Sequence, residues 1–146
     1  MALGAALARS LQSPCVIWLR GELGVGKTTL ARGAIQYFQP DLRVRSPTYT
    51  LIESYALDIF TLHHLDLYRV RDPLELELLG LREFADDVLM IEWPEQGGKA
   101  TPVADVELWL QHTDAEQRRL QAVPRSRQGR LVLRQLQLIL QTSGYI

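Results

Sequence analysis

The amino-acid sequence predicts an α/β fold, a three-layer sandwich built on a mostly parallel sheet with antiparallel additions. Three observations predict it. A buried-strand pattern at residues 15–19 leads through a glycine-rich loop into a helical pattern at residues 29–38. Residues 88–91 form a continuous apolar run, which is typical of a central strand buried on both faces. Residues 51–55 and 61–68 are β-rich runs with a short connector, which favours an antiparallel pair.

The remaining elements follow from apolar spacing and from chain-breaking residues. Leu3, Leu7 and Leu11 recur every four residues, so an N-terminal helix should pack on the sheet until the Ser-Pro pair at 13–14 ends it. Pro73 is suited to the first position of a helix. The other predicted elements are an extended piece from Val44, helices at 74–79 and 81–85, a loop at 96–99, strands at 106–110 and 119–123, and a last helix at 131–141.

Length and composition indicate one domain, residues 1–146, with a sizeable core. A formal net charge of −1 argues against a chain that binds nucleic acid by itself through a broad basic surface. The single cysteine, Cys15, cannot form an internal disulfide, which fits a reducing cytoplasm. No apolar run is long enough to cross a membrane, and Arg9 interrupts the apolar start that would otherwise resemble a signal peptide.

Residues 21–28 match the phosphate-binding pattern G-x-x-x-x-G-K-[ST], in the strand–loop–helix order that the pattern needs. The glycines allow backbone N–H groups to surround phosphate oxygens, and the helix N-terminus adds its positive dipole end. Lys27 would reach the β- and γ-phosphates, and the Thr28 hydroxyl would ligate Mg²⁺. The alternative is a tight glycine turn. The predicted nucleotide-binding residues are Glu22, Leu23, Gly24, Val25, Gly26, Lys27, Thr28 and Thr29.

Three side chains are candidates for completing the chemistry of phosphoryl transfer. Glu92 directly follows the apolar run 88–91, which places it at the C-terminal end of a core strand, where ligands bind in open α/β sheets. Asp66 would point away from the core if Leu65 and Leu67 face it. Thr48 lies in a proline-stiffened loop, positioned like the switch threonine of P-loop GTPases. The alternatives are a helix cap or surface acid for the carboxylates and a turn-forming hydroxyl for Thr48.

The predicted base is adenine. Guanine-specific P-loop proteins read the base with Asn-Lys-x-Asp, whereas this chain contains no Asn and has Lys only at positions 27 and 99. His63 and His64 are adjacent, so on a strand they face opposite sides, and we expect both to be structural. Trp93 could stack on a base or on a partner, or cover the sheet edge.

Charge is unevenly distributed along the chain. From residue 117 to residue 146 there is no acidic residue, but there are six arginines: Arg118, Arg119, Arg125, Arg127, Arg130 and Arg134. One interpretation is an ordinary solvated surface. The other is a docking face for an acidic partner or for the phosphate backbone of RNA.

Four segments together resemble the TsaE (YjeE) family, the bacterial P-loop ATPases of tRNA threonylcarbamoyladenosine synthesis. They are residues 21–29, Ser46-Pro-Thr-Tyr-Thr50, His64-Leu-Asp-Leu-Tyr-Arg69 and Ile91-Glu-Trp-Pro-Glu95, and the resemblance covers nearly the whole chain. It implies a cytoplasmic ATPase that partners the TsaB–TsaD complex and resets it between turnovers. TsaD, not the ATPase, would transfer the threonylcarbamoyl group to the adenosine next to the anticodon, so tRNA would be reached through that complex.

The resemblance also implies roles for individual residues. Thr28 and Glu92 would hold Mg²⁺, Lys27 would hold phosphate, Thr48 would belong to a switch loop, and Asp66 would assist hydrolysis. Two family features are missing: a threonine-containing segment that would precede Met1, and a Gly-Arg pair near the last strands. The second absence leaves open whether Arg118 or Arg119 touches nucleotide.

Three functions remain after the sequence has been considered. The first is an Mg²⁺-dependent ATP hydrolase whose turnover depends on partner proteins, with Glu92, Asp66 and Thr48 as its catalytic residues. The second is a small-molecule or nucleoside kinase, for which Arg69 and Arg71 are the nearby candidates for an arginine-rich lid. The third is a non-enzymatic switch that docks and releases partners on nucleotide exchange. The four segments favour the first.

Overall fold

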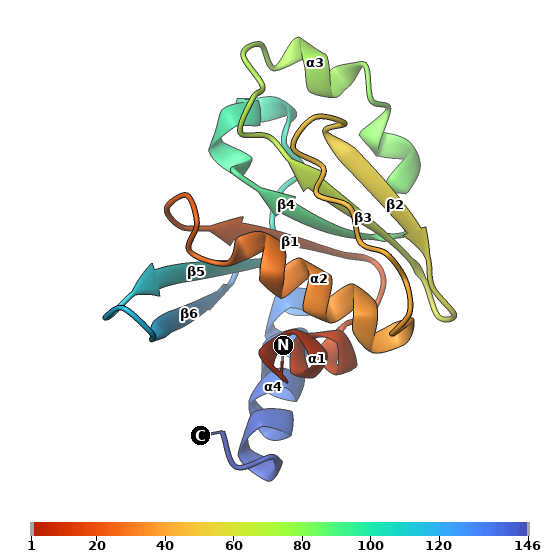
Figure 1. The fold of residues 1–146 in the computed structure, drawn as a ribbon. Coiled ribbons are helices and arrows are strands. Elements are labelled where there is room, and N and C mark those ends of the chain that lie inside the picture. The colour runs from red at the N-terminus through yellow and green to blue at the C-terminus, as the bar shows by residue number, and fades with distance from the viewer. Residues whose placement is uncertain (1, 146) are drawn as a thin grey trace.

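The computed structural model describes residues 2–145 as a six-stranded sheet with helices packed against it (Figure 1). The strand order is β2-β3-β4-β1-β5-β6. The pairs β3–β4, β4–β1 and β1–β5 are parallel, and the edge strands β2 and β6 pair antiparallel. The predicted mostly parallel sheet and the hairpin are therefore confirmed. The strand bounds are β1 Cys15–Arg20, β2 Ile52–Ala56, β3 Thr61–Asp66, β4 Val88–Glu92, β5 Val106–His112 and β6 Arg118–Pro124.

The helices divide between the two faces of the sheet. α1 (Ala2–Ser10), α2 (Lys27–Phe38) and α4 (Arg127–Thr142) share one hydrophobic cluster with alternate residues of β1, β4 and β5. The short α3 (Leu74–Glu77) and the 3₁₀ turns η1 (Leu81–Phe84) and η2 (Pro94–Ala100) contribute to a second cluster on the opposite face. β4 is buried at every position because both clusters cover it, as its continuous apolar run predicted.

Several local predictions need correction. α1 packs mainly against α2 and α4 rather than on the sheet. It approaches α2 so closely that a Cβ at Gly4 would lie 2.8 Å from the backbone of Gly33. The loop predicted at 96–99 lies within η2, and α3 is shorter than the helix predicted at 74–79. α4 begins at Arg127, four residues before the prediction, because the Ser126 side chain caps it by accepting the N–H of Gly129 at 2.9 Å.

The sheet topology positions the candidate site. β1, β3 and β4 are adjacent and parallel, so their carboxyl ends lie at the same edge. In register, Glu92 at the end of β4 stands between Leu19 of β1 and Asp66 of β3. The glycine-rich loop leaves β1 at this edge and turns into α2, with Gly26 at a φ of 113° that only glycine adopts readily.

None of the described helices is long and apolar enough to span a membrane.

Candidate functional site

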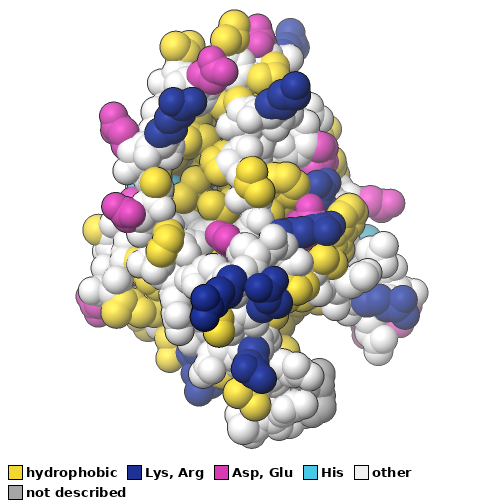
Figure 2. Space-filling view, turned by 180° about the vertical axis from the view of Figure 1, so that it is seen from behind, with side chains coloured by type: hydrophobic (Ala, Val, Ile, Leu, Met, Phe, Trp, Pro, Cys, Tyr) yellow, Lys and Arg dark blue, Asp and Glu magenta, His cyan; other side chains and the backbone are white. Residues whose placement is uncertain are grey.

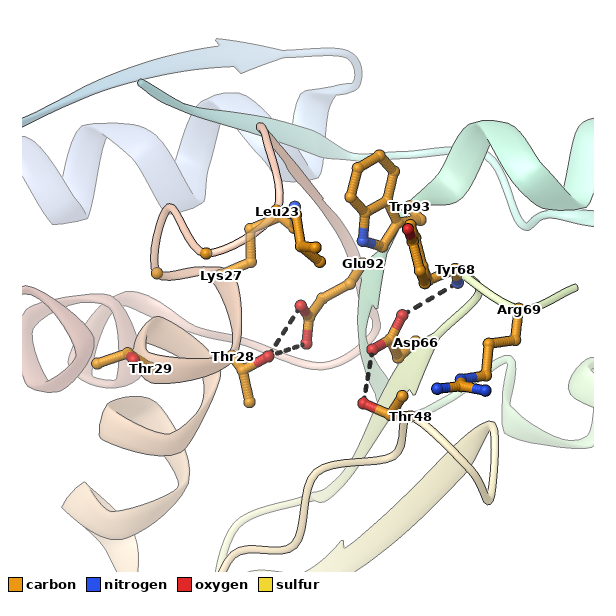
Figure 3. Close-up of a pocket in the computed structure, with 12 residues that line it drawn as sticks. Leu23, Lys27, Thr28, Thr29, Thr48, Asp66, Tyr68, Arg69, Glu92 and Trp93 are labelled. Carbon is orange, nitrogen blue, oxygen red and sulfur yellow. Dashed lines mark hydrogen bonds between the residues drawn. The ribbon is translucent and has the colours of Figure 1, made fainter. Parts of the chain in front are cut away.

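A cavity of about 380 Å³ opens at the carboxyl edge of the sheet (Figure 3). Its walls come from segments far apart in the sequence: the glycine-rich loop, the start of α2, the loop before β2, and the residues that end β3 and β4. The lining residues are Leu23, Gly24, Gly26, Lys27, Thr28, Thr29, Thr48, Asp66, Tyr68, Arg69, Glu92 and Trp93. The fold therefore brings together the candidates that the sequence could only name one by one.

Glu92 is held by hydrogen bonds from two neighbouring elements. The Thr28 hydroxyl at the start of α2 lies 3.0 and 2.9 Å from its two carboxylate oxygens (Figure 3). The Nε2 of His64, on β3, lies 2.6 Å from Oε2. Glu92 is 3% exposed and His64 is completely buried, so this carboxylate has one well-defined position. The Nδ1 of His64 has no hydrogen-bond partner among the described residues.

Asp66 occupies the neighbouring position and has a different set of partners. The Thr48 hydroxyl donates to its Oδ2 at 3.2 Å, and the backbone N–H of Tyr68 donates to Oδ1 at 3.0 Å (Figure 3). Leu65 and Leu67 belong to the cluster on the opposite face, so Asp66 points away from them as predicted. Burial raises the pKa of Asp66; the Tyr68 hydrogen bond opposes this shift, and the negative charge of Glu92 adds to it.

Lys27 is turned toward its own loop. Its ammonium donates to the carbonyls of Gly21 and Glu22, the latter at 3.1 Å, and lies 4.0 Å from the centre of the Trp93 ring. Burial lowers the pKa of Lys27, whereas the nearby carboxylates, Glu92 foremost, oppose that shift. The Trp93 ring also packs against the Tyr68 ring, with 5.0 Å between the two ring centres. Trp93 therefore lies over the lysine at the sheet edge, and its stacking on a base or on a partner stays a prediction.

Two residues next to the site hold strained backbone conformations. Leu51, which ends the loop that carries Thr48, has a φ of 66°, and Trp93, which follows Glu92, has a φ of 55°. For residues other than glycine such angles cost about 1–3 kcal/mol and persist only where the surroundings over-determine them. Both side chains pack against the second hydrophobic cluster. That packing holds the two loop ends in place beside Asp66 and Glu92.

Four further residues were named from the sequence as possible nucleotide contacts: Glu22, Val25, Arg118 and Arg119. Glu22 is exposed and Val25 is buried, and their side chains do not line the cavity. Arg118 and Arg119 are both exposed on β6, but only Arg118 contacts the loop backbone, donating from Nε to the carbonyl of Val25 at 3.1 Å.

The sequence named Arg69 only as a candidate for a kinase lid and did not place it among the predicted nucleotide-site residues. Arg69 lines the cavity, and its guanidinium lies 4.5 Å from the Tyr49 ring. Its place three residues after Asp66 was the available signal. The contact of His64 with Glu92 was missed as well, although the two-residue spacing from Asp66 put both side chains on one strand face.

The donor atoms at Thr28 and Glu92 suit magnesium held together with phosphate. Among residues 2–145 no group of three or more His, Cys, Asp or Glu side chains is arranged to hold a metal ion by itself. The adjacent hydroxyl and carboxylate are hard oxygen donors, and Mg²⁺ is typically bound by one or two such groups with water and substrate phosphates completing its shell. The residues present therefore fit that ion.

The fold and the site define the chain as an α/β protein with a glycine-rich strand–loop–helix unit and two strand-end carboxylates beneath it. Residues 1–120 match the family model "Threonylcarbamoyl adenosine biosynthesis protein TsaE". The chain belongs to the TsaE family.

Curated relatives agree with this assignment, and a solved structure shares the fold. A tRNA threonylcarbamoyladenosine biosynthesis protein TsaE from Haemophilus influenzae is 38% identical over 120 residues, 81% of this chain and 75% of the relative. The TsaE of Aquifex aeolicus is 37% identical over 109 residues, 73% of this chain and 77% of the relative. The crystal structure of YdiB from Bacillus subtilis has the same fold, with a TM-score of 0.76 at 23% identity over 94% of this chain and 86% of that one.

Proposed function

We propose that this chain binds ATP and Mg²⁺ in the cavity at the carboxyl edge and hydrolyses ATP on behalf of a TsaB–TsaD-type complex in the cytoplasm. The relatives at 34–39% identity carry names from tRNA threonylcarbamoyladenosine biosynthesis, which supports that pathway for this chain. The chain would not transfer the threonylcarbamoyl group itself. Adenine is the expected base because the guanine-reading motif needs Asn, which the sequence lacks.

The observation that carries this proposal is the pairing of Asp66 with Glu92 in register on adjacent strands. The two carboxylates stand side by side, yet each has its own partners. Glu92 is fixed by Thr28 and His64, the arrangement expected of a metal-holding carboxylate. Asp66 contacts Thr48 of the predicted switch loop, and its pKa is raised. Both properties suit a group that orients water and accepts its proton.

In the proposed hydrolysis, Lys27 turns from the Gly21 and Glu22 carbonyls to the phosphates as ATP enters the loop. Thr28 and Glu92 would hold Mg²⁺, which would neutralise charge on the phosphates. Asp66 orients a water whose oxygen attacks the γ-phosphorus; the bond to the β–γ bridging oxygen breaks, and Asp66 accepts the water proton. Arg69 is close enough to the cavity to offset charge on the departing phosphate. The Thr48 loop, drawn inward while ATP is bound, would relax after hydrolysis.

The test is release of inorganic phosphate from ATP, measured with and without the TsaB–TsaD pair. Asp66→Asn should lower kcat about 100-fold or more with little loss of nucleotide binding, because general-base catalysis typically contributes factors of about 10²–10⁴. Thr28→Ala and Glu92→Gln should weaken Mg²⁺-dependent nucleotide binding as well as turnover. Asp87→Asn is the matched control for Glu92→Gln. Like Glu92, Asp87 bonds a histidine of β3, but this is His63, at 2.7 Å, on the opposite face of the sheet.

Each alternative function has its own outcome. Phosphate that appears on an added small acceptor rather than in water would make the chain a kinase. Nucleotide exchange that switches partner binding without phosphate release would make it a non-enzymatic switch. If Asp66→Asn and Glu92→Gln both hydrolyse ATP at the native rate in the presence of partners, the residue assignment is wrong.

A further inference from the structure

The outer face of α4 concentrates positive charge that nothing else on the helix offsets. Arg127, Arg130 and Arg134 are all exposed and recur at helical spacing, so they share one face and line one shallow hollow with Leu131. α4 contains no acidic residue, and none of the three arginines forms an ion pair among residues 2–145. Figure 2 shows lysine and arginine side chains gathered over the lower part of the molecule, where Figure 1 places α4.

This arrangement is unfavourable for the isolated chain. Like charges three and four residues apart on a helix repel each other, and an acid at either spacing would relieve the repulsion. Other arginines of the same acid-free stretch are engaged: Arg125 bonds Glu107 at 2.8 Å, and Arg118 bonds the Val25 carbonyl. The family model ends at residue 120, so α4 lies beyond the part that identifies the family. A charged face with no internal partner is free to meet an external group of opposite charge.

We propose that the α4 face formed by Arg127, Arg130 and Arg134 binds the phosphate backbone of RNA. The guanidinium fork donates two parallel hydrogen bonds to phosphate oxygens, and this face is built from arginine with no lysine. A protein-binding face is typically enriched in aromatic anchors, and α4 contains none. Three glutamines are also exposed on α4, and neutral amides contact phosphates as well: Gln135, Gln137 and Gln141. With three contacts, this face would position RNA rather than read its sequence.

The α4 face lies apart from the nucleotide cavity, since the two share no lining residue. RNA binding therefore does not require ATP. The inference depends on the proposed function only in the choice of a tRNA as the probe, and it can fail or succeed whether or not the chain hydrolyses ATP.

The test is binding of the full chain to a fluorescent, unmodified tRNA transcript, without nucleotide and in EDTA, at several salt concentrations. The triple variant Arg127→Gln, Arg130→Gln, Arg134→Gln should bind at least about tenfold more weakly at low salt, and its log–log salt slope should fall by about 3 because each lost phosphate contact removes about one unit. Circular dichroism should show an unchanged helix content, because all three side chains are exposed.

A charge-matched triple variant, Arg43→Gln, Arg45→Gln, Arg82→Gln, removes three exposed arginines elsewhere and should bind tRNA like the native chain. Equal binding by the native chain and the α4 variant would overturn the proposal. So would equal losses in the two triple variants, which would indicate only a general charge effect. Binding to polyglutamate that depends on α4, with none to tRNA, would instead assign the face to an acidic protein.

Discussion

At the scale of single residues, the neighbours His63 and His64 show how strand alternation separates two roles. His63 faces the second cluster, where it stacks on Phe84 at 3.8 Å and bonds Ser54 and Asp87 at 2.7 Å. His64 faces α2 and bonds Glu92. The sequence predicted opposite faces because side chains alternate along a strand. The two-residue spacing placed His64 on the same face as Asp66, but its contact with Glu92 depends on the register between β3 and β4, which no local pattern encodes.

Replacing His64 should loosen the metal-holding carboxylate. We expect His64→Leu to lower the affinity for Mg²⁺ in ATP-analogue binding by about 10–100-fold, the usual effect of removing a group that orients a metal ligand. His64→Gln should keep most of that affinity, because the amide can donate to Glu92. The measurement is a Mg²⁺ titration of fluorescent nucleotide binding, independent of turnover.

His63→Leu is the control for that experiment, since it removes the other carboxylate–histidine contact of the same strand, whose carboxylate, Asp87, is more exposed than Glu92. It should lower stability and leave the Mg²⁺ dependence unchanged. A His64→Leu protein that titrates like the native chain would show that Thr28 alone suffices to position Glu92.

At the scale of elements, α4 shows what apolar spacing misses. The apolar periodicity begins at Leu131, so the first turn of the helix was not predicted. That turn depends on contacts with another part of the chain: Asp105 accepts hydrogen bonds from Ser126 Oγ at 2.6 Å and from the Arg125 N–H at 2.7 Å, and also from Val16 N–H at 2.7 Å. The same network ties the start of α4 to β1. The N-cap Ser126 was a local signal that apolar spacing does not register, whereas the contacts that hold Ser126 and Arg125 on Asp105 arise only in the tertiary structure.

Gly129 is required where α4 crosses the start of β5. A Cβ at this position would lie 1.8 Å from the Asp105 carbonyl oxygen. Gly129→Ala should therefore destabilise the protein by about 1–3 kcal/mol through overpacking. Helix propensity alone predicts a gain of about 1 kcal/mol in the opposite direction.

Urea denaturation shows whether Gly129→Ala lowers or raises the free energy of unfolding. Gln135→Ala, at an exposed position of the same helix, should change the free energy of unfolding by no more than about 0.5 kcal/mol. A Gly129→Ala protein as stable as the native chain would mean that α4 can shift away from Asp105 at no cost.

At the scale of the whole molecule, Glu107 links three parts of the chain from a buried position on β5. It bonds Arg125 after β6 at 2.8 Å and Arg20 at the end of β1 at 3.3 Å. Burial alone would raise the pKa of Glu107, but the Arg125 hydrogen bonds and the positive charges of both arginines hold it below its ordinary value. The guanidinium carbon of Arg20 in turn lies 5.0 Å from the centre of the Trp18 ring and 4.7 Å from the centre of the Trp109 ring.

The lowered pKa gives stability a defined pH dependence. An unfolded Glu titrates near about pH 4.3, so the contribution of Glu107 is complete above that value and is lost as the pH falls through the lower folded pKa. Glu107→Gln should be less stable than the native chain by about 1–3 kcal/mol at neutral pH, and the difference should shrink below about pH 4. Urea unfolding at several pH values measures this.

Two probes in the same experiment test the prediction of one domain, which rests on length and composition. Tryptophan fluorescence and far-UV circular dichroism should report a single coincident transition. A constant difference between Glu107→Gln and the native chain down to pH 3 would contradict the ionic origin of the effect. Separate transitions for the two probes would contradict a single cooperative unit.

The sequence by itself determined the fold class, the glycine-rich loop, the strand-end carboxylate Glu92 and the family. It also determined that Asp66 points away from Leu65 and Leu67. These are carried by local patterns: alternation on strands, four-residue recurrence on helices, and fixed motif spacing. Tertiary structure alone decided which groups touch: His64 on Glu92, Thr48 on Asp66, Trp93 over Lys27, Arg69 at the cavity, and the start of α4 on Asp105. The reason is that strand register and helix docking join residues separated by tens of positions, and no short-range pattern encodes such distances.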